Sequence, residues 1–450
     1  MITRLNKTGW LILLALLPLI GKGQTNDTLR VNLETALQVA LSDNPTIQIA
    51  DQEIKRVDYS QKEAWYGLIP TLSGTAQLSK YVLPAKMSMF GSIMDNPADY
   101  MGSATLTLSL PLVAPALWKS IQMTELQMQM ANEQARASKI TLRNEVIKAY
   151  YQILLAQDSY HTLQEGYGLA KQNYEEALQR FNLGLGSEYD YISAEVQMQN
   201  IIPTIAQVEN GIAQAKSYLK VLMGVNLVIP ISVEGKLTDF ENKVTGLLTN
   251  RQVMSLDNNS DLIQLDIQQK QLEKQLQLQR TQRMPTLAGF TRYGYSLSAT
   301  KNVELNLGGM PMKIEARKDN FSDGLILGLQ LNVPIFSGFI NIIREKRIAV
   351  SAKTLAIQRS YVEDQLYLQA TTAINDMAKS VKQMETNKKG IQLAEKGYSI
   401  AQDRYNNGMG TMLELRSSSQ ALTQAKLSYN QAIADYLTAQ ANYEKVIGQD

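Results

Sequence analysis

The sequence predicts a mixed fold in which membrane-type β-strands and very long α-helices alternate in two tandem repeats of one chain. Three observations indicate this. The register that places Gly184 on Gly408 also places Gly224 on Gly448. Within each copy, two segments alternate apolar and polar residues with period two, the pattern of a half-buried strand. Each pair of segments is followed by a helical pattern far longer than the usual helix of a globular protein.

Composition narrows the class of protein. The chain has 450 residues, a net charge of +2, no cysteine and a single histidine, His161. Disulfides and cysteine nucleophiles are therefore excluded, and structural zinc is disfavoured. No Lys/Arg block of the kind that binds nucleic acid is present. The sequence contains no recognisable set of a catalytic nucleophile, base and acid, and no recognisable phosphate-binding loop. We therefore expect no catalytic activity and no cofactor.

The first 23 residues have the features of an export signal. Arg4 and Lys7 precede an apolar run over 10–20, and the small residues Gly21 and Gly23 stand where cleavage would occur. The alternative is a membrane anchor, but the run is short for a helix crossing about 30 Å of hydrocarbon. No later stretch approaches the apolar length of a spanning helix, so we expect any membrane contact to be made by strands.

Residues 24–69 predict two helices, over 31–42 and 46–68, separated by Asn44-Pro45. The segments 70–112 and 285–336 each predict a strand hairpin, with one apolar face and one face of small and hydroxyl residues. We expect these hairpins to cross the membrane, with Phe290, Tyr293 and Tyr295 in an interfacial aromatic girdle; a soluble sheet is the alternative.

The segments 113–224 and 337–450 each predict a long helical hairpin. The first has helices over about 115–181 and up to about 223, with a kink at Pro203; the second has helices over about 339–407 and up to about 447. The helices are rich in Ala and Gln, and a bundle with a full core would carry more large apolar side chains. This composition favours helices packed side by side around a hollow interior over a solid coiled coil. Between the copies, 225–284 predicts a mixed linker with a β-like run at 228–233 and a helix.

Four strands in one chain cannot close a barrel, and open strand edges are not stable in lipid. The sequence therefore predicts a symmetric oligomer, without fixing the number of subunits.

The whole mature chain resembles the TolC-like outer-membrane efflux proteins. The resemblance rests on the repeat, on the turn motifs Arg180-Phe181-Asn182-Leu183-Gly184 and Arg404-Tyr405-Asn406-Asn407-Gly408, and on the junction Val333-Pro334-Ile335-Phe336-Ser337-Gly338. It implies a homotrimeric channel-tunnel of 12 strands and 12 helices, in contact with outer-membrane lipid and extending through the periplasm of a Gram-negative envelope. It also implies a periplasmic adaptor and an inner-membrane transporter of the RND, ABC or MFS type.

The resemblance also implies a periplasmic constriction. Its candidate residues are Asp190, Glu414, Tyr405 and Ser417. Carboxylates at Asp190 and Glu414 would form rings that attract cations, although an acid in the first turn of a helix also complements the helix dipole. Ser417 stands where some relatives carry a second acid, and Gly410 where some carry a basic residue, so we expect fewer ionic links to hold a closed state.

The turns between the long helices are the candidate adaptor-docking tip: Leu183, Gly184, Leu185, Gly186, Ser187, Gly408, Met409, Gly410 and Thr411. The predicted function is passive export from a tripartite efflux system. There are two alternatives: a conduit for type I protein secretion, and a scaffold or adhesin without a pore. The cargo, the partner transporter class and copper binding by the Met-rich outer loop are not readable from the sequence.

Overall fold

The computed structural model describes residues 28–83, 86–89, 92–95, 98–241, 255–307, 310–316 and 320–449. The predicted export signal and part of the linker, 242–254, lie outside these residues. The chain divides into two compact units. One comprises Met1–Ala40, Ala149–Glu241 and Asn387–Ala434; the other comprises Leu41–Lys148, Asn242–Thr386 and Asp435–Asp450.

The two copies share one order of elements: a helix, a strand hairpin, a long helix and a returning helix. The first copy contains α2 (Pro45–Tyr66), β2 (Thr71–Lys80), β5 (Ala98–Val113), α3 (Pro115–Asn182) and α4 (Glu188–Met223). The second contains α6 (Ser260–Thr281), β7 (Thr286–Thr300), β10 (Asn320–Asn332), α7 (Ile340–Asn406) and α8 (Met412–Val446). The predicted alternation of strands and long helices is confirmed, and Pro203 lies inside α4.

A short helix, α1 (Leu33–Asp43), precedes the first copy. The predicted break after it has a capping mechanism, because the Asn44 side chain accepts a hydrogen bond from the Thr46 amide and Pro45 occupies the first turn of α2. Proline is well tolerated there, since its missing amide would have no partner inside the helix.

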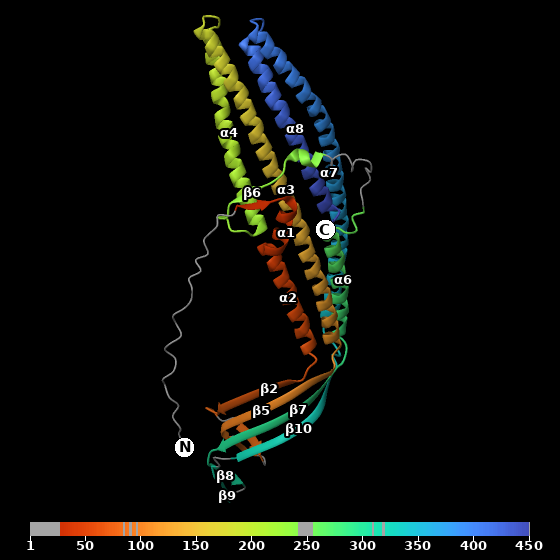
Figure 1. The fold of residues 1–450 in the computed structure, drawn as a ribbon. Coiled ribbons are helices and arrows are strands. Elements are labelled where there is room, and N and C mark those ends of the chain that lie inside the picture. The colour runs from red at the N-terminus through yellow and green to blue at the C-terminus, as the bar shows by residue number, and fades with distance from the viewer. Residues whose placement is uncertain are drawn as a thin grey trace, which may run out of the picture. The chain divides into compact units, whose positions relative to one another are not determined.

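The four long strands form one antiparallel sheet in the order β10-β7-β5-β2 (Figure 1). Leu72 of β2 faces Leu108 of β5, Leu108 faces Thr291 of β7, and Thr291 faces Leu327 of β10. The two hairpins of the repeat are thus joined through β5 and β7, and β2 and β10 form the outer edges of this sheet.

Two further hairpins were not predicted. β3 (Lys86–Met89) pairs with β4 (Ser92–Asp95), and β8 (Val303–Leu307) pairs with β9 (Met310–Ile314). Both lie between the long strands of the predicted hairpins, where the sequence indicated no strand, because strands of four or five residues carry too few positions to show a period of two. The side chains of Met87, Met89 and Met94, in the Met-rich outer loop, lie outside the described part of the chain.

In the unit that contains Ala149–Glu241, a parallel ladder joins β1 (Leu29–Val31) to β6 (Ile231–Val233). The segment after β6 is attached to α3 by polar contacts. Tyr150 donates to the Glu234 carbonyl at 2.5 Å, and the Leu237 amide donates to Asp158 at 3.0 Å. The short helix η1 (Leu237–Phe240) buries Leu237 completely. The second half of the predicted β-like run, Ile231–Val233, is therefore an anchored strand, whereas residues 228–230 form a turn and no strand.

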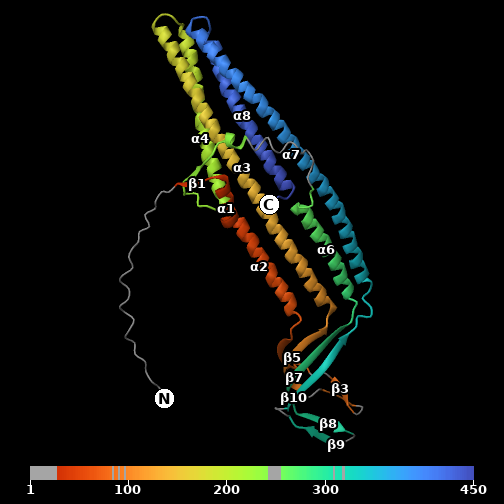
Figure 2. The ribbon, with the colours of Figure 1, turned by 45° about the vertical axis from the view of Figure 1, so that its right-hand side comes forward.

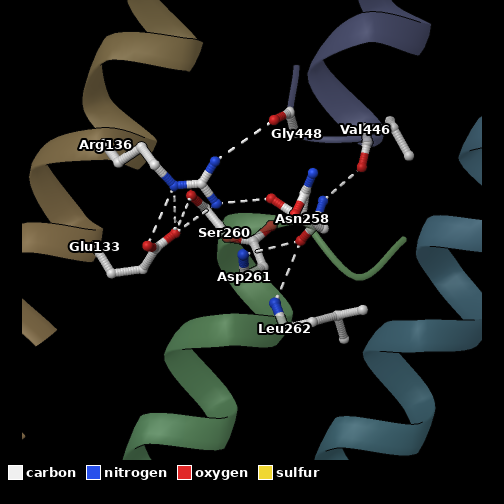
Figure 3. Close-up of polar contacts among 9 residues, drawn as sticks. Glu133, Arg136, Asn258, Ser260, Asp261, Leu262, Val446 and Gly448 are labelled. Atoms are coloured by element: carbon white, nitrogen blue, oxygen red, sulfur yellow. Dashed lines mark hydrogen bonds and ion pairs between the residues drawn. The ribbon is translucent and has the colours of Figure 1, made fainter. Parts of the chain in front are cut away.

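In the other unit, the first turn of α6 contacts α3 and the end of α8 (Figures 2 and 3). Arg136 of α3 donates to the Asn258 carbonyl at 2.7 Å and contacts Glu133, which accepts from Ser260 at 2.5 Å. Asn259 caps α6 and donates to the Val446 carbonyl at 2.7 Å. The bonds of Asn259 satisfy two amides at the start of α6 and one carbonyl at the end of α8, which are groups that helix ends leave without intrahelical partners. No helix in the described part of the chain is both long and apolar enough to cross a membrane.

Candidate channel surfaces

The strand sheet has two chemically different faces. The register places on one face the residues Leu72, Ala76, Leu78, Ala104, Leu106, Leu108, Leu287, Leu325, Leu327, Leu329 and Leu331. The opposite face carries Thr71, Ser73, Thr75, Gln77, Ser103, Thr105, Thr107, Ser109, Ser296, Ser322 and Gln330. On the apolar face, Leu327 is 82% exposed within the single chain and Leu78 is 74% exposed. Such a face needs a lipid or protein partner.

The aromatic side chains of β7 are divided between these faces. Tyr293 and Tyr295 lie on the apolar face, where Tyr295 approaches Phe321 with ring centroids 5.8 Å apart. The expectation that Phe290 joins them is wrong, because Phe290 is an odd number of residues away and points to the polar face. There its ring lies against Gly328, where a side chain would leave less than 3.0 Å to the ring.

The turns between the long helices rest on a shared core. Buried Ala177, Ala194, Tyr398, Tyr405, Met412, Leu415 and Leu422 come from α3, α4, α7 and α8, so the two helical hairpins pack together near their tips (Figure 1). Gly184 and Gly408 have φ of +70° and +71°, the left-handed conformation that reverses the chain after a helix. Their matching geometry explains why both copies keep glycine there.

The predicted constriction residues have different environments. Asp190 is half-buried in the first turn of α4, and its amide donates to the capping Ser187 hydroxyl at 3.2 Å. Glu414 is exposed and forms a reciprocal cap with Thr411 at 3.2 and 3.3 Å; it also lies 3.9 Å from Arg404. Glu414 thus has a structural function in starting α8, independent of any channel function.

Tyr405 is only 5% exposed and belongs to the core of the tip. Burial raises the pKa of its phenol, and nearby Asp190 and Glu176 act in the same direction against Arg180. The buried phenol of Tyr405 therefore contributes to the packing of the helices around it. Ser417 is exposed on the first turns of α8.

The candidate docking turns expose apolar side chains. Leu183, Leu185 and Met409 are exposed by 66%, 75% and 67%. Two further apolar side chains that were not predicted, Tyr189 and Leu413, are exposed on the first turns of α4 and α8. These two residues occupy equivalent positions in the two copies, so the repeat itself was the signal that could have identified them.

Two arginines that the sequence analysis did not assign connect the hairpins. The Arg180 guanidinium lies 4.6 Å from the centre of the Tyr405 ring and donates to the Asn406 carbonyl at 2.5 Å. Arg416 of α8 donates to the Ser193 hydroxyl of α4 at 2.8 Å. Its equivalent position in the first copy is Ile192, so comparison of the copies gave no signal. Among the residues with described placement, no three His, Asp or Glu side chains gather closely enough to hold a metal ion.

This chain, which joins an amphipathic strand sheet to long helical hairpins, has the fold of solved outer-membrane channels. The structure aligns with the Campylobacter jejuni CmeC outer membrane channel at a TM-score of 0.72 and 15% identity, covering 92% of this chain and 85% of that one. In sequence, it is 21% identical over 397 residues to the outer membrane protein TolC of Vibrio cholerae serotype O1, covering 86% of each chain.

The probable efflux pump outer membrane protein TtgC of Pseudomonas putida is 24% identical over 438 residues, covering 92% of this chain and 82% of that relative. The outer membrane efflux protein family profile matches residues 36–225 and 253–449. The chain therefore belongs to the outer membrane efflux protein family, which confirms the predicted family and outer-membrane location.

Proposed function

We propose that this protein is the outer-membrane channel-tunnel of a tripartite efflux system. The observation that carries the proposal is the four-stranded sheet, which has one apolar and one hydroxyl-rich face and outer edges at β2 and β10. Both features suit a barrel wall, because lipid needs an apolar outer face and paired edges, while a hydrated lumen accepts the polar face.

The number of subunits in the proposal is three. Four strands per chain then give a closed barrel of 12 strands, wide enough to leave a water-filled lumen. Likewise, four long helices per chain supply the 12 helices of the tunnel wall. Native mass spectrometry of the detergent-extracted oligomer tests this number directly, and a stable monomer or dimer contradicts it.

The chain acts as a passive conduit and catalyses no reaction. Its partners are a periplasmic adaptor, docked on the exposed turn residues around Leu185 and Met409, and an inner-membrane transporter that supplies the energy. Apolar side chains exposed on a tight turn support docking, since they gain free energy when a partner covers them.

Asp190 and Glu414 are proposed to line the narrowest part of the tunnel as carboxylate rings. Their positions in the first turns of α4 and α8, beside the shared tip core, support this function. Single-channel conductance of the purified oligomer in a planar bilayer tests the pore, and a silent, inserted oligomer contradicts it. In a conducting channel, Asp190→Asn together with Glu414→Gln lowers cation selectivity; unchanged selectivity contradicts the constriction but leaves the pore intact.

A further inference from the structure

One formal charge stands in the middle of the otherwise neutral polar face of the sheet. Arg292 of β7 is exposed on this face, opposite Thr107 of β5 and Ile326 of β10. The other charged side chains described in β2, β5, β7 and β10 do not lie on this part of the polar face. Lys80 and Asp323 are on the apolar face. Asp99 lies at a β-bulge and forms an ion pair with Lys301 at 3.2 Å.

The neighbours of Arg292 hold its guanidinium without neutralising it. The guanidinium carbon of Arg292 lies 5.5 Å from the centre of the Phe290 ring, and this ring lies against Gly328. A cation near an aromatic face keeps its charge and is attracted by the ring electrons. The structure shows no carboxylate within ion-pair distance of Arg292 among the residues it describes.

The surroundings also leave room for a ligand and supply donors. A side-chain carbon added at Gly294 or at Gly324 would meet nothing within 4 Å, so the surface beside Arg292 is open. Thr105 and Thr107 carry hydroxyl groups on the same face. A guanidinium with adjacent hydroxyl donors suits phosphate, carboxylate and sulfonate groups, which accept hydrogen bonds from both.

We propose that Arg292, repeated by symmetry around the assembled oligomer, forms a cationic ring in the barrel lumen that binds multivalent anionic solutes. This inference rests on the proposed channel function, since only a closed barrel turns the polar face into a lumen. Rings of Arg or Lys are a known way to attract anions into a pore. The surrounding lipid also confines the field to the water-filled lumen, which raises the local anion concentration.

The test is block of single-channel current by inorganic tripolyphosphate added to the wild-type oligomer and to three variants. Arg292→Gln removes the charge, and Arg292→Lys keeps it. Lys80→Gln is the matched control, because it removes one positive charge per chain from the opposite face of the same sheet. Low ionic strength is required, since the field of the ring is screened beyond about 10 Å at 0.1 M salt.

Wild type, Arg292→Lys and Lys80→Gln are expected to be blocked at similar tripolyphosphate concentrations. For Arg292→Gln the half-blocking concentration rises by about tenfold or more, the loss expected for hydrogen bonds to a charged group. Equal block of wild type and Arg292→Gln overturns the ring while the pore stands. A wild-type oligomer that is inserted but silent overturns both the ring and the channel function.

Discussion

At Gly448 the backbone has φ of +70°, and a side-chain carbon there would lie 2.1 Å from the Asn258 carbonyl oxygen. The Gly448 carbonyl is also within 3.5 Å of the Arg136 guanidinium (Figure 3). This one residue lets the end of α8 approach the start of α6. Its counterpart in the first copy, Gly224, has the same left-handed conformation with φ of +69°.

Gly448→Ala is expected to lower the free energy of unfolding by about 1–2 kcal/mol or more, from the left-handed backbone penalty together with the displaced contact. Gly390→Ala is the control, since this glycine lies inside α7 with nothing within 4 Å of the added carbon. It should be neutral or stabilise by about 0.5–1 kcal/mol through helix propensity. Guanidinium unfolding midpoints measure both, and equal shifts for the two variants contradict this account.

Tyr429 is the residue whose titration the fold changes most clearly. Burial, followed by its hydrogen bond to Glu241, raises the pKa of the Tyr429 phenol to about 12. The unfolded phenol has its ordinary pKa of about 10. The raised pKa favours the folded state at neutral pH, and this stability is lost as pH rises from about 10 to about 12.

Tyr429→Phe removes this titration, so the stability advantage of wild type over the variant should shrink between about pH 8 and about pH 11. The midpoint of unfolding at both pH values measures it. Tyr367→Phe, at an exposed position of α7, controls for general alkaline effects. A wild-type advantage that stays constant over this range contradicts the assignment.

At the scale of elements, the helices and long strands were predictable because they are periodic over many residues. The start of α3 at Pro115 agrees with the sequence-based expectation, and its end at Asn182 lies one residue beyond it. Contacts between elements were not predictable. Arg416 is two residues from Glu414 in an ordinary helical pattern, and only the packing of α8 on α4 reveals its bond to Ser193. The face of Phe290 was misassigned because aromatic content was given more weight than period-two position.

The link between α8 and α4 gives a prediction for the tip. Arg416→Met removes the hydrogen bond to Ser193 but keeps much of the aliphatic contact. Loss of a hydrogen bond from a charged group at a part-buried site corresponds to roughly 1 kcal/mol, or about fivefold faster opening of the local structure. Hydrogen exchange over 188–196 measures it. Arg347→Met, on the exposed surface of α7, should leave this segment unchanged; unaltered exchange in Arg416→Met shows that the bond contributes nothing.

At the scale of the whole molecule, the single chain is incomplete in a defined way. Its sheet has an apolar face exposed over several strands and two outer edges, and neither is stable in water or in lipid without further contacts. In the proposed oligomer, the pairing of these edges would also decide which face of the sheet meets lipid. This dependence makes the orientation of the sheet testable through assembly.

Leu327 and Gln330 of β10 provide the matched pair for that test, since they lie on the apolar and the polar face of one strand. Arginine at a lipid-facing midplane position costs about 2–4 kcal/mol, whereas a lumen-facing position tolerates charge. Leu327→Arg should therefore reduce the amount of heat-resistant oligomer recovered from outer membranes, while Gln330→Arg should assemble like wild type. Quantitative gel analysis of unheated membrane samples measures both. If instead Gln330→Arg fails and Leu327→Arg assembles, the polar face meets the lipid or a protein partner, and the barrel must be reconstructed with the opposite orientation.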